Sequence, residues 1–276
     1  MASSTRGVAI VRYADGAFSS NEDTVAIEEP LEIRISGETL AITMRTPGHD
    51  RELVAGFLLA EGVIASRADL ATVTYCGRVG DEARENTIDV TLAPGVKPPI
   101  DDDTGMLARR GTITTSACGV CGRRSVDDLL EATNPLVTTE RVDPRIVLAA
   151  LAGLKDRQPI FAKTGGCHAA SLVAFDGTVR GTHEDVGRHN AVDKVVGAQV
   201  LAGTSALPAH LLAVSGRSSF EIVQKAFRAR IPVVAAVSAP SSLAIELARR
   251  TGVTLCGFVR GNAMTIYAGD AIAEGS

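Results

Sequence analysis

The chain has 276 residues, a formal net charge of −4, 45% hydrophobic residues and 22% charged residues. This length is enough for one large domain or two smaller ones, and the composition is typical of a globular protein. The small negative charge, the absence of tryptophan and an aromatic content of 4% argue against nucleic-acid binding. Because the sequence shows no apolar run long enough to span a bilayer and no signal-peptide core, we expect a soluble cytoplasmic protein with no membrane association.

The first part of the chain predicts a small α+β roll. Apolar residues alternate over 31–35 and again over 40–44, and Ser36-Gly37-Glu38 between them predicts a hairpin. Asp50 is the expected N-cap of a helix that covers residues 53–58, and Gly62 suits its C-terminal end. Two further strands are expected at 72–75 and 87–92, which gives the order strand-strand-helix-strand-strand.

Residues 93–112 have the composition of a linker. Three prolines and a glycine over residues 94–99 are followed by three aspartates and an Arg-Arg-Gly segment. We therefore divide the chain into a small α+β domain over residues 1–110 and a larger α/β domain over residues 111–276. A short helix is expected from Ser125 to Leu130, and Asp143-Pro144 is expected to open another helix.

The second half alternates short apolar runs with helical segments, which predicts a largely parallel sheet between helices. Helices are expected to follow Asp185, Ser219 and Ser242, and a hairpin turn is expected at Asp176-Gly177. The expected strands cover residues 159–163, 171–175, 178–182, 211–214, 233–237 and 253–259.

Cys118 and Cys121 form the one Cys-x-x-Cys motif of a chain with five cysteines. Thiols at this spacing are suited to redox exchange, persulfide transfer or metal binding. Arg123, Arg124 and a following helix N-terminus would lower the pKa of these thiols. Each of the other cysteines is isolated in the sequence, which disfavours a four-ligand zinc site. A thioredoxin-like dithiol oxidoreductase and a zinc-stabilised interaction module remain the alternatives.

Two serine-rich segments lie where a strand leads into a helix: Ser215-Gly216-Arg217-Ser218 and Ser238–Ser242. Backbone N–H groups and the helix dipole at such places attract phosphate, and Arg217 adds a bidentate donor. Serines there are also ordinary N-caps. Ligands of open α/β sheets bind beyond the carboxyl ends of the strands, so we expect a nucleotide or another anionic ligand. Neither a Walker A motif nor Gly-x-Gly-x-x-Gly occurs.

Polar residues are dense over 182–190, a segment that includes His183, Arg188 and His189. This cluster is either a salt-bridged first helical turn or a ligand-recognition site. The Thr164–His168 segment is expected to join it from a neighbouring strand end.

Six segments together resemble the FdhD family, the sulfurtransferase accessory proteins of formate dehydrogenases. They occur in order between residues 115 and 267, and upstream the likeness is more diffuse. The segments are Ser116–Gly122, Thr164–Ala169, Glu184–Lys194, Ser215–Lys225, Ser238–Ala244 and Gly257–Tyr267.

The resemblance implies a sulfur relay. Members of the family take sulfur from a cysteine desulfurase as a cysteine persulfide and pass it to the molybdenum or tungsten bis-guanine-dinucleotide cofactor of formate dehydrogenase. By position, Cys118 would carry the persulfide and Cys121 would assist. The guanine-dinucleotide part maps to Phe258, Val259, Arg260, Gly261, Asn262 and Ala263, and a GDP-like nucleotide is expected to substitute for the cargo. We add Ser215, Gly216, Arg217, Ser218 and His189 to this predicted site.

The resemblance also implies a homodimer whose larger domain has a cytidine deaminase-like mixed sheet with helices, preceded by the α+β roll. The deaminase likeness does not extend to chemistry, because zinc deaminases need His-x-Glu followed by Pro-Cys-x-x-Cys. Here His183 and Glu184 are adjacent, and Ala117 precedes the thiol pair. We therefore expect no catalytic metal.

Overall fold

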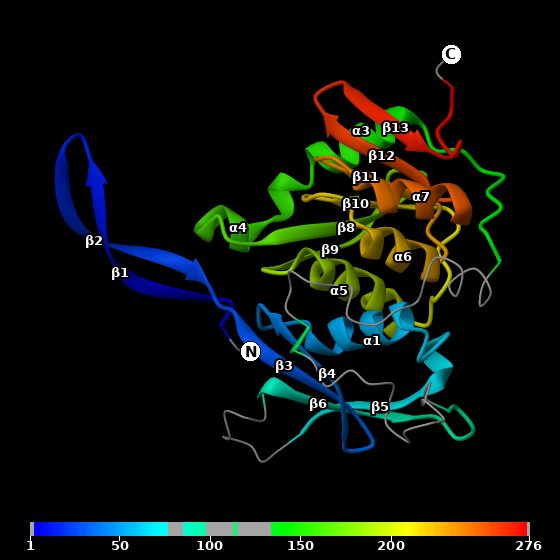
Figure 1. Cartoon of the computed structure of the whole chain (residues 1–276), viewed down its shortest axis with the longest axis horizontal. Helices are drawn as coiled ribbons and strands as arrows, with labels where there is room; N and C mark the ends of the chain where they lie inside the picture. The colour runs from blue at the N-terminus through cyan, green and yellow to red at the C-terminus, as the bar shows by residue number, and fades with distance from the viewer. Residues whose placement is uncertain (1–2, 77–84, 98–112, 115–133, 275–276) are drawn as a thin grey trace.

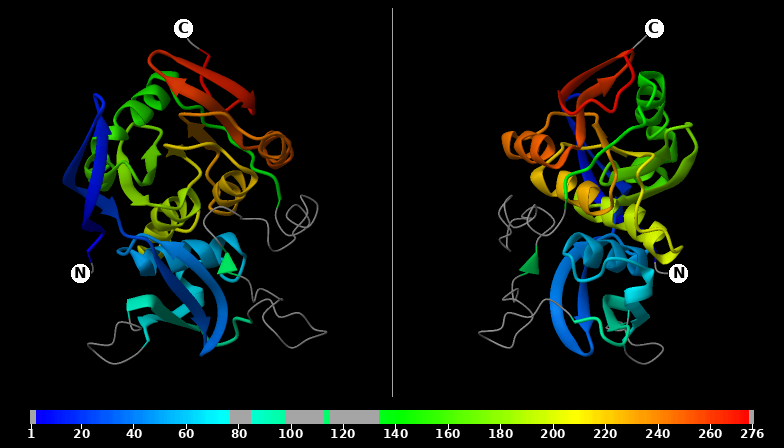
Figure 2. Two further views of the ribbon diagram at one scale, coloured as in Figure 1. Left: turned by 60° about the vertical axis from the view of Figure 1, so that its left-hand side comes forward. Right: turned by 90° about the vertical axis from the view of Figure 1, so that its right-hand side faces the viewer.

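The structure, a computed structural model, describes residues 3–76, 85–97, 113–114 and 134–274. Its strands form sheets of two, five and six strands. Figures 1 and 2 show the five-stranded sheet at one end of the molecule, the six-stranded sheet with its helices at the other, and the two-stranded ribbon projecting to one side.

The ribbon consists of β1 (Thr5–Ala14) and β2 (Ala17–Ala26), which pair antiparallel over their whole length. Asp15 and Gly16 join them, and both have positive φ angles, 52° and 81°. An Asp-Gly pair with two positive φ angles forms the two-residue turn that fits the twist of a hairpin. This ribbon was not predicted from the sequence, although the Asp15-Gly16 pair is typical of a hairpin turn.

The five-stranded sheet has the order β5-β6-β3-β4-β7 and carries one helix, α1 (Asp50–Ala60). Its strands are β3 (Glu29–Ile35), β4 (Glu38–Arg45), β5 (Leu70–Tyr75), β6 (Thr87–Leu92) and β7 (Ile113–Thr114), with a 3-10 turn at Arg67–Asp69. The predicted strand-strand-helix-strand-strand order is confirmed. The N-cap of α1 is His49 rather than Asp50, because Asp50 already has helical backbone geometry and its carboxylate binds Arg45.

The six-stranded sheet has the order β13-β12-β11-β10-β8-β9. Its strands are β8 (His168–Ala174), β9 (Val179–Asp185), β10 (His210–Val214), β11 (Val233–Ala236), β12 (Thr254–Arg260) and β13 (Ala263–Ala268). The helices are α3 (Pro144–Ala152), α4 (Pro159–Thr164), α5 (Arg188–Leu201), α6 (Phe220–Arg228) and α7 (Ser242–Thr251), and Lys155–Arg157 form a 3-10 turn.

Three expectations for this half were wrong. Residues 159–163 form α4 rather than a strand, since Pro159 occupies a first helical position. The sheet is mixed rather than largely parallel, because only the β10–β11 and β11–β12 pairs are parallel. A further strand, β13, follows the one predicted to be last and pairs antiparallel with it.

The mixed α/β class predicted from the sequence is confirmed, and the deaminase likeness and the boundary at residue 110 stay predictions. The predicted helix from Ser125 to Leu130 lies outside the described residues. Within the part of the chain that is described, no helix is both long and apolar enough to cross a bilayer.

Close packing of α1 against α5 joins the two larger sheets into one core. A Cβ atom on Gly56 would lie 2.0 Å from the carbonyl oxygen of Asp193, and one on Gly197 would lie 1.8 Å from that of Glu52. Real Cβ atoms do not approach so closely, so only glycine permits this crossing. One continuous hydrophobic cluster runs from Leu31 on β3 through the helix pair.

Candidate functional site

One edge of the six-stranded sheet collects the carboxyl ends of four strands. Strands β9, β10, β11 and β12 run in the same direction, whereas β8 runs opposite to its neighbours. The amino end of β8 therefore lies at this edge, where His168 pairs with Asp185. Helices α5, α6 and α7 follow β9, β10 and β11, so all three begin there. Such an edge concentrates backbone N–H groups and the positive ends of helix dipoles.

The loop after β10 holds the amino end of β8 in place. The Ser215 hydroxyl accepts a hydrogen bond of 2.9 Å from the Ala169 N–H, and the Ser215 N–H donates to the Ala169 carbonyl at 3.0 Å. A Cβ atom on Gly216 would lie 3.3 Å from Nδ1 of His168 and 3.7 Å from Cδ of Arg188. His168 and Arg188 therefore meet above Gly216. Burial, reinforced by the charge of Arg188, lowers the pKa of His168 and favours the neutral imidazole.

Two polar atoms at this edge are buried without a hydrogen-bond partner among the described residues: Nε of Arg188 and the hydroxyl of Ser218. Ser218 is only 1% exposed. Arg188 is the first residue of α5, where the helix dipole disfavours a cation. A buried polar atom without a partner costs about 1–3 kcal/mol. The position of Arg188 and the two unpartnered atoms therefore fit a site completed by an anionic ligand.

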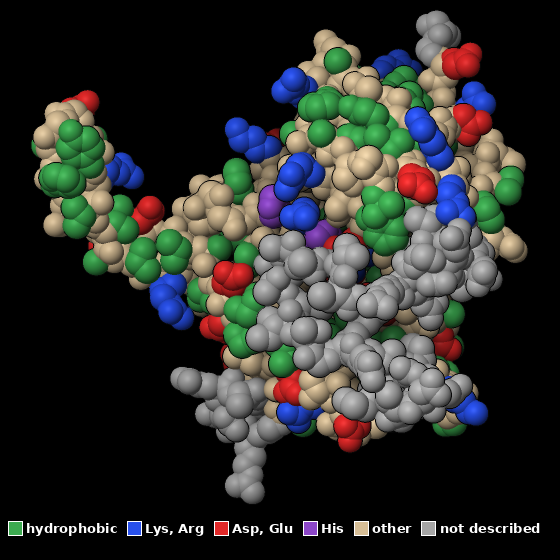
Figure 3. All heavy atoms as spheres, viewed as in Figure 1, with side chains coloured by type: hydrophobic (Ala, Val, Ile, Leu, Met, Phe, Trp, Pro, Cys, Tyr) green, Lys and Arg blue, Asp and Glu red, His purple; other side chains and the backbone are tan. Residues whose placement is uncertain are grey.

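Histidine and Lys or Arg side chains gather side by side in the middle of the face shown in Figure 3. The Lys and Arg side chains bring positive charge to this place, although the whole chain carries a net charge of −4. A local concentration of positive charge attracts an anion independently of the overall charge.

The edge continues through a chain of short contacts to β12. The Ser241 N–H donates to the Ser218 carbonyl at 3.0 Å, and the Phe258 N–H donates to the Ser238 carbonyl at 3.2 Å. Phe258 has a φ angle of 51° and a side chain that is 40% exposed, at an irregular point of the β12–β13 pairing. A left-handed phenylalanine costs of order 1–2 kcal/mol. Its backbone is therefore held by its surroundings while its ring is left accessible.

A buried ion pair fixes the start of α5. Nζ of Lys194 lies 2.7 Å from the carboxylate of Asp185, and these side chains are 2% and 0% exposed. Lys194 also donates to the carbonyls of Thr46 and Glu184. The carboxylate accepts hydrogen bonds from the Thr46 N–H, the Gly187 N–H and the Asn190 amide. The network therefore ties β9 and α5 to the loop after β4.

Two neighbours of this pair are also used by the fold. The Glu184 carboxylate accepts hydrogen bonds of 2.9 and 2.7 Å from the N–H groups of Ile160 and Phe161, so it caps α4. Asn190 donates to the Met44 carbonyl at 2.8 Å. Much of the polar segment 182–190 is therefore structural.

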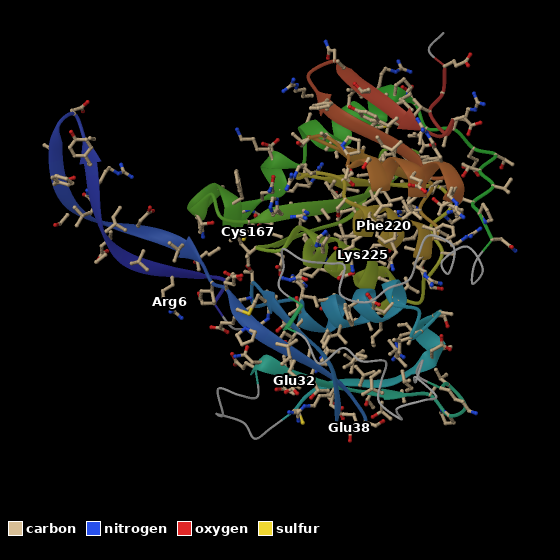
Figure 4. The ribbon with its side chains drawn as sticks, in the orientation of Figure 1. Arg6, Glu32, Glu38, Cys167, Phe220 and Lys225 are labelled. Atoms are coloured by element: carbon tan, nitrogen blue, oxygen red, sulfur yellow. The ribbon has the colours of Figure 1, made fainter. Side chains whose placement is uncertain are left out.

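His189 connects the first turns of α5 and α6. Its Nε2 lies 2.9 Å from the Ser219 hydroxyl and 2.9 Å from the Glu221 carboxylate. Burial lowers the pKa of His189, and the hydrogen bond with Glu221 opposes that shift. Nearby, Lys225 of α6, which is labelled in Figure 4, forms a buried ion pair with Asp193 of α5 at 2.7 Å. These contacts orient the two helix N-termini relative to each other.

The two buried thiols of the described residues, those of Cys167 and Cys256, are poor candidates for sulfur chemistry. Burial raises the pKa of Cys256 to about 12 and also raises that of Cys167, which lies 3.7 Å from the Thr46 hydroxyl. Cys167 lies where β8 begins (Figure 4). Cys76 is exposed. A thiol with a raised pKa is a weak nucleophile at neutral pH.

The residues predicted from the sequence to bind a nucleotide lie at the edge just described. Ser215–Ser218 follow β10, Phe258–Arg260 end β12, Gly261 and Asn262 form the turn, and Ala263 begins β13. Arg217 is exposed, and it makes no hydrogen bond or ion pair with the other described residues. Cys118 and Cys121 lie outside the described residues.

The role of Lys194 and the approach of both His168 and Arg188 to Gly216 were not predicted from the sequence. Asn190 and Lys194 are four residues apart and therefore share one helix face, a spacing that could have indicated a common partner. That common partner is Asp185. No pattern in the sequence indicated that Thr46, far away in the chain, contacts both Asp185 and Lys194. Among the described residues no group of three or more His, Cys, Asp or Glu side chains could hold a metal ion.

The family model described as FdhD/NarQ matches residues 26–272. The chain belongs to the FdhD/NarQ family. A relative from Anaeromyxobacter dehalogenans strain 2CP-1, named sulfur carrier protein FdhD, is 56% identical over 252 residues, which cover 89% of this chain and 87% of the relative. A protein of the same name from Mycobacterium tuberculosis is 50% identical over 255 residues, which cover 89% and 90% of the two chains.

The family fold is also found in a solved structure. A protein of Desulfotalea psychrophila, described as a candidate formate dehydrogenase accessory protein, superposes with a TM-score of 0.76 over 98% of this chain and 99% of that one. At 24% sequence identity, this likeness concerns the fold alone.

The burial of His183 predicts a pH-dependent stability. His183 lies against His49 with ring centroids 4.3 Å apart, and burial together with the charge of His49 lowers its pKa from 6.5 to about 4. The unfolded chain binds the proton more readily between these values, so stability falls as pH is lowered from about 6.5 to about 4. In urea unfolding across this range, His183→Gln should have a flatter profile than the wild type. Parallel profiles for the two proteins would contradict the assignment.

Proposed function

We propose that this chain is a sulfur carrier that serves formate dehydrogenase. Cys118 takes sulfur from a cysteine desulfurase as a persulfide and passes it to a molybdenum or tungsten bis-guanine-dinucleotide cofactor, which is the cargo. The observation that carries this proposal is family membership, together with relatives of up to 56% identity that are named sulfur carrier proteins. We further propose a cytoplasmic location and a homodimer.

Loading exchanges one sulfur–sulfur bond for another. The Cys118 thiolate attacks the outer sulfur of the desulfurase persulfide, a new S–S bond forms, and the desulfurase thiolate leaves. Delivery follows when the Cys121 thiolate attacks the Cys118 sulfur and releases the outer sulfur to the metal as sulfide. The two cysteines are then left as a disulfide, which a cellular thiol reduces.

The described edge supplies the cargo site in this proposal. Phosphate oxygens of the cargo would accept hydrogen bonds from Arg188 and Ser218, whose Nε and hydroxyl are otherwise unpartnered among the described residues. The helix N-termini of α5, α6 and α7 favour the same negative charge. Residues 258–263 would hold the guanine, and the exposed ring of Phe258 offers a surface on which a base can stack.

Nothing among the described residues favours the dithiol oxidoreductase or the zinc-stabilised module over this proposal. Both remain distinguishable in solution. An oxidoreductase would reduce disulfides without binding a guanine nucleotide, and a zinc module would contain stoichiometric metal.

A loading experiment tests the role of Cys118. After incubation with a cysteine desulfurase and free cysteine, the peptide that contains residue 118 should gain the mass of one sulfur atom. Cys118→Ser should abolish this gain and the activity of formate dehydrogenase matured with it. Cys76→Ser, which removes an exposed thiol elsewhere, is the matched control and should load normally. An unmodified peptide in the wild type, while the desulfurase turns over, would refute the proposal.

A binding experiment tests the cargo site separately. Arg188→Met should weaken the binding of GDP, because a hydrogen bond to a charged group contributes about 1.5–3 kcal/mol, or about ten- to a hundredfold in affinity. Arg180→Met, at the opposite end of β9, is the control and should bind like the wild type. Calorimetric titration measures both. Equal affinities for all three proteins would remove Arg188 from the site.

A further inference from the structure

Two histidines lie beside Arg188 at the edge of the six-stranded sheet where α5, α6 and α7 begin. His189 follows Arg188 in the first turn of α5, and His168 is the first residue of β8. A Cβ atom on Gly216 would lie 3.3 Å from Nδ1 of His168 and 3.7 Å from Cδ of Arg188, so both side chains approach the same point. The edge therefore combines one permanent cation with two rings that can gain a charge.

The surroundings of His168 favour its neutral form. Burial lowers the pKa of His168, and Arg188 and His189 lower it further, whereas the carboxylate of Asp185 opposes the shift. Asp185 is already paired with Lys194 at 2.7 Å. An additional negative charge at the edge would act in the opposite direction to Arg188 and favour the protonated ring.

The surroundings of His189 also hold one nitrogen ready to exchange a proton. Its Nε2 lies 2.9 Å from the Ser219 hydroxyl and 2.9 Å from the Glu221 carboxylate. A carboxylate at this distance accepts a hydrogen bond, so Nε2 carries a hydrogen atom and Nδ1 is the nitrogen that can gain a proton. Burial lowers the pKa of His189, the hydrogen bond with Glu221 opposes this shift, and the charges of Lys225 and Arg188 add to it.

Other charges packed around α5 are paired with one another. Lys225 of α6 lies 2.7 Å from Asp193, and Lys194 lies 2.7 Å from Asp185. Glu61 of α1 interacts electrostatically with both members of the Lys225–Asp193 pair. The described edge therefore responds to an arriving anion chiefly through Arg188 and the two histidines.

We propose that the binding of a pyrophosphate group at this edge is coupled to proton uptake by His168 and His189. This inference rests on the proposed function, because it describes how pH regulates the cargo site of that proposal. A phosphate held by Nε of Arg188 and the hydroxyl of Ser218, which are unpartnered among the described residues, places negative charge beside the two rings. Negative charge favours protonation of the rings, and by reciprocity the protonated rings favour the anion.

The direction of the pH dependence follows from the two protonation states. Without ligand, the pKa values of both histidines lie below their usual 6.5, so the rings are neutral in mildly alkaline solution. A bound anion raises both values. The affinity is therefore low at high pH, rises as the pH falls through the pKa values of the complex, and becomes constant below those of the free protein. Each unit by which the anion raises one pKa corresponds to about a tenfold gain in affinity.

Calorimetric titration of the full chain tests the coupling, with a symmetrical dinucleotide in which pyrophosphate joins two guanosines as the probe. A pyrophosphate diester has no group that titrates near neutral pH, so any proton taken up enters the protein. Titrations in buffers of different ionisation enthalpy give the number of protons taken up for each ligand bound. The wild type should take up protons near neutral pH, and its affinity should rise about tenfold from about pH 8 to about pH 5.5.

Glutamine variants locate the protons. His168→Gln and His189→Gln each remove one titratable ring and keep a polar side chain, so each should reduce the proton uptake. The combined variant should take up no proton and have a flat affinity profile. His210→Gln is the matched control, because His210 also has a pKa lowered by burial and by a nearby arginine but lies at the amino end of β10, away from this edge. It should take up protons like the wild type.

Contrary results separate this inference from the proposed function. Wild-type binding without proton uptake and with equal affinity at both pH values would overturn the coupling and retain the cargo site, and it requires no variant to fold. Unaltered uptake in a folded combined variant would also overturn the coupling. No binding of the dinucleotide at any pH would overturn both the coupling and the cargo site. Loading of Cys118 with sulfur, measured in the same samples, reports on the sulfur carrier independently.

Discussion

The buried pair of Asp185 and Lys194 is the contact on which the arrangement of this molecule depends. Removing two charges from water is costly unless each is paired and hydrogen-bonded. Here the carboxylate accepts three further hydrogen bonds, and the ammonium donates to two carbonyls. Two of those contacts go to Thr46, in the loop after β4. The pair therefore fixes the positions of β9, the start of α5 and the five-stranded sheet relative to one another.

This fixed relation sets the geometry of the sheet edge at which α5, α6 and α7 begin. With α5 held at Gly187, Arg188 is placed at the helix start, where it meets His168 above Gly216. The His189–Glu221 contact then sets α6 relative to α5, and close glycine packing between α1 and α5 completes the support. Side chains held by such rigid elements keep their relative positions. The two buried thiols of the described residues have raised pKa values, which makes them weak nucleophiles at neutral pH.

Patterns in the sequence predicted those strands and helix starts that depend on neighbouring residues alone. Alternation and turn residues located β3, β4 and β6, and Asp143-Pro144 located the start of α3. The serine-rich loops predicted an anion site at this edge, because strand-to-helix loops attract anions, and that site stays a prediction. Local rules failed where tertiary contacts decide: short apolar runs do not distinguish α4 from a strand, and strand direction depends on the whole sheet. The contact of Thr46 with Asp185 joins residues 139 apart, which no single-sequence pattern indicates.

The most direct test of this account is a double-mutant cycle on the central pair, with the free energy of unfolding measured in urea. Lys194→Met leaves a buried carboxylate without its counter-ion and should cost about 3–5 kcal/mol. Asp185→Asn in the same background should recover part of that loss, with a coupling energy of about 1–3 kcal/mol. Strictly additive effects of the two substitutions would show that the pair does not act as a unit, and would contradict the account.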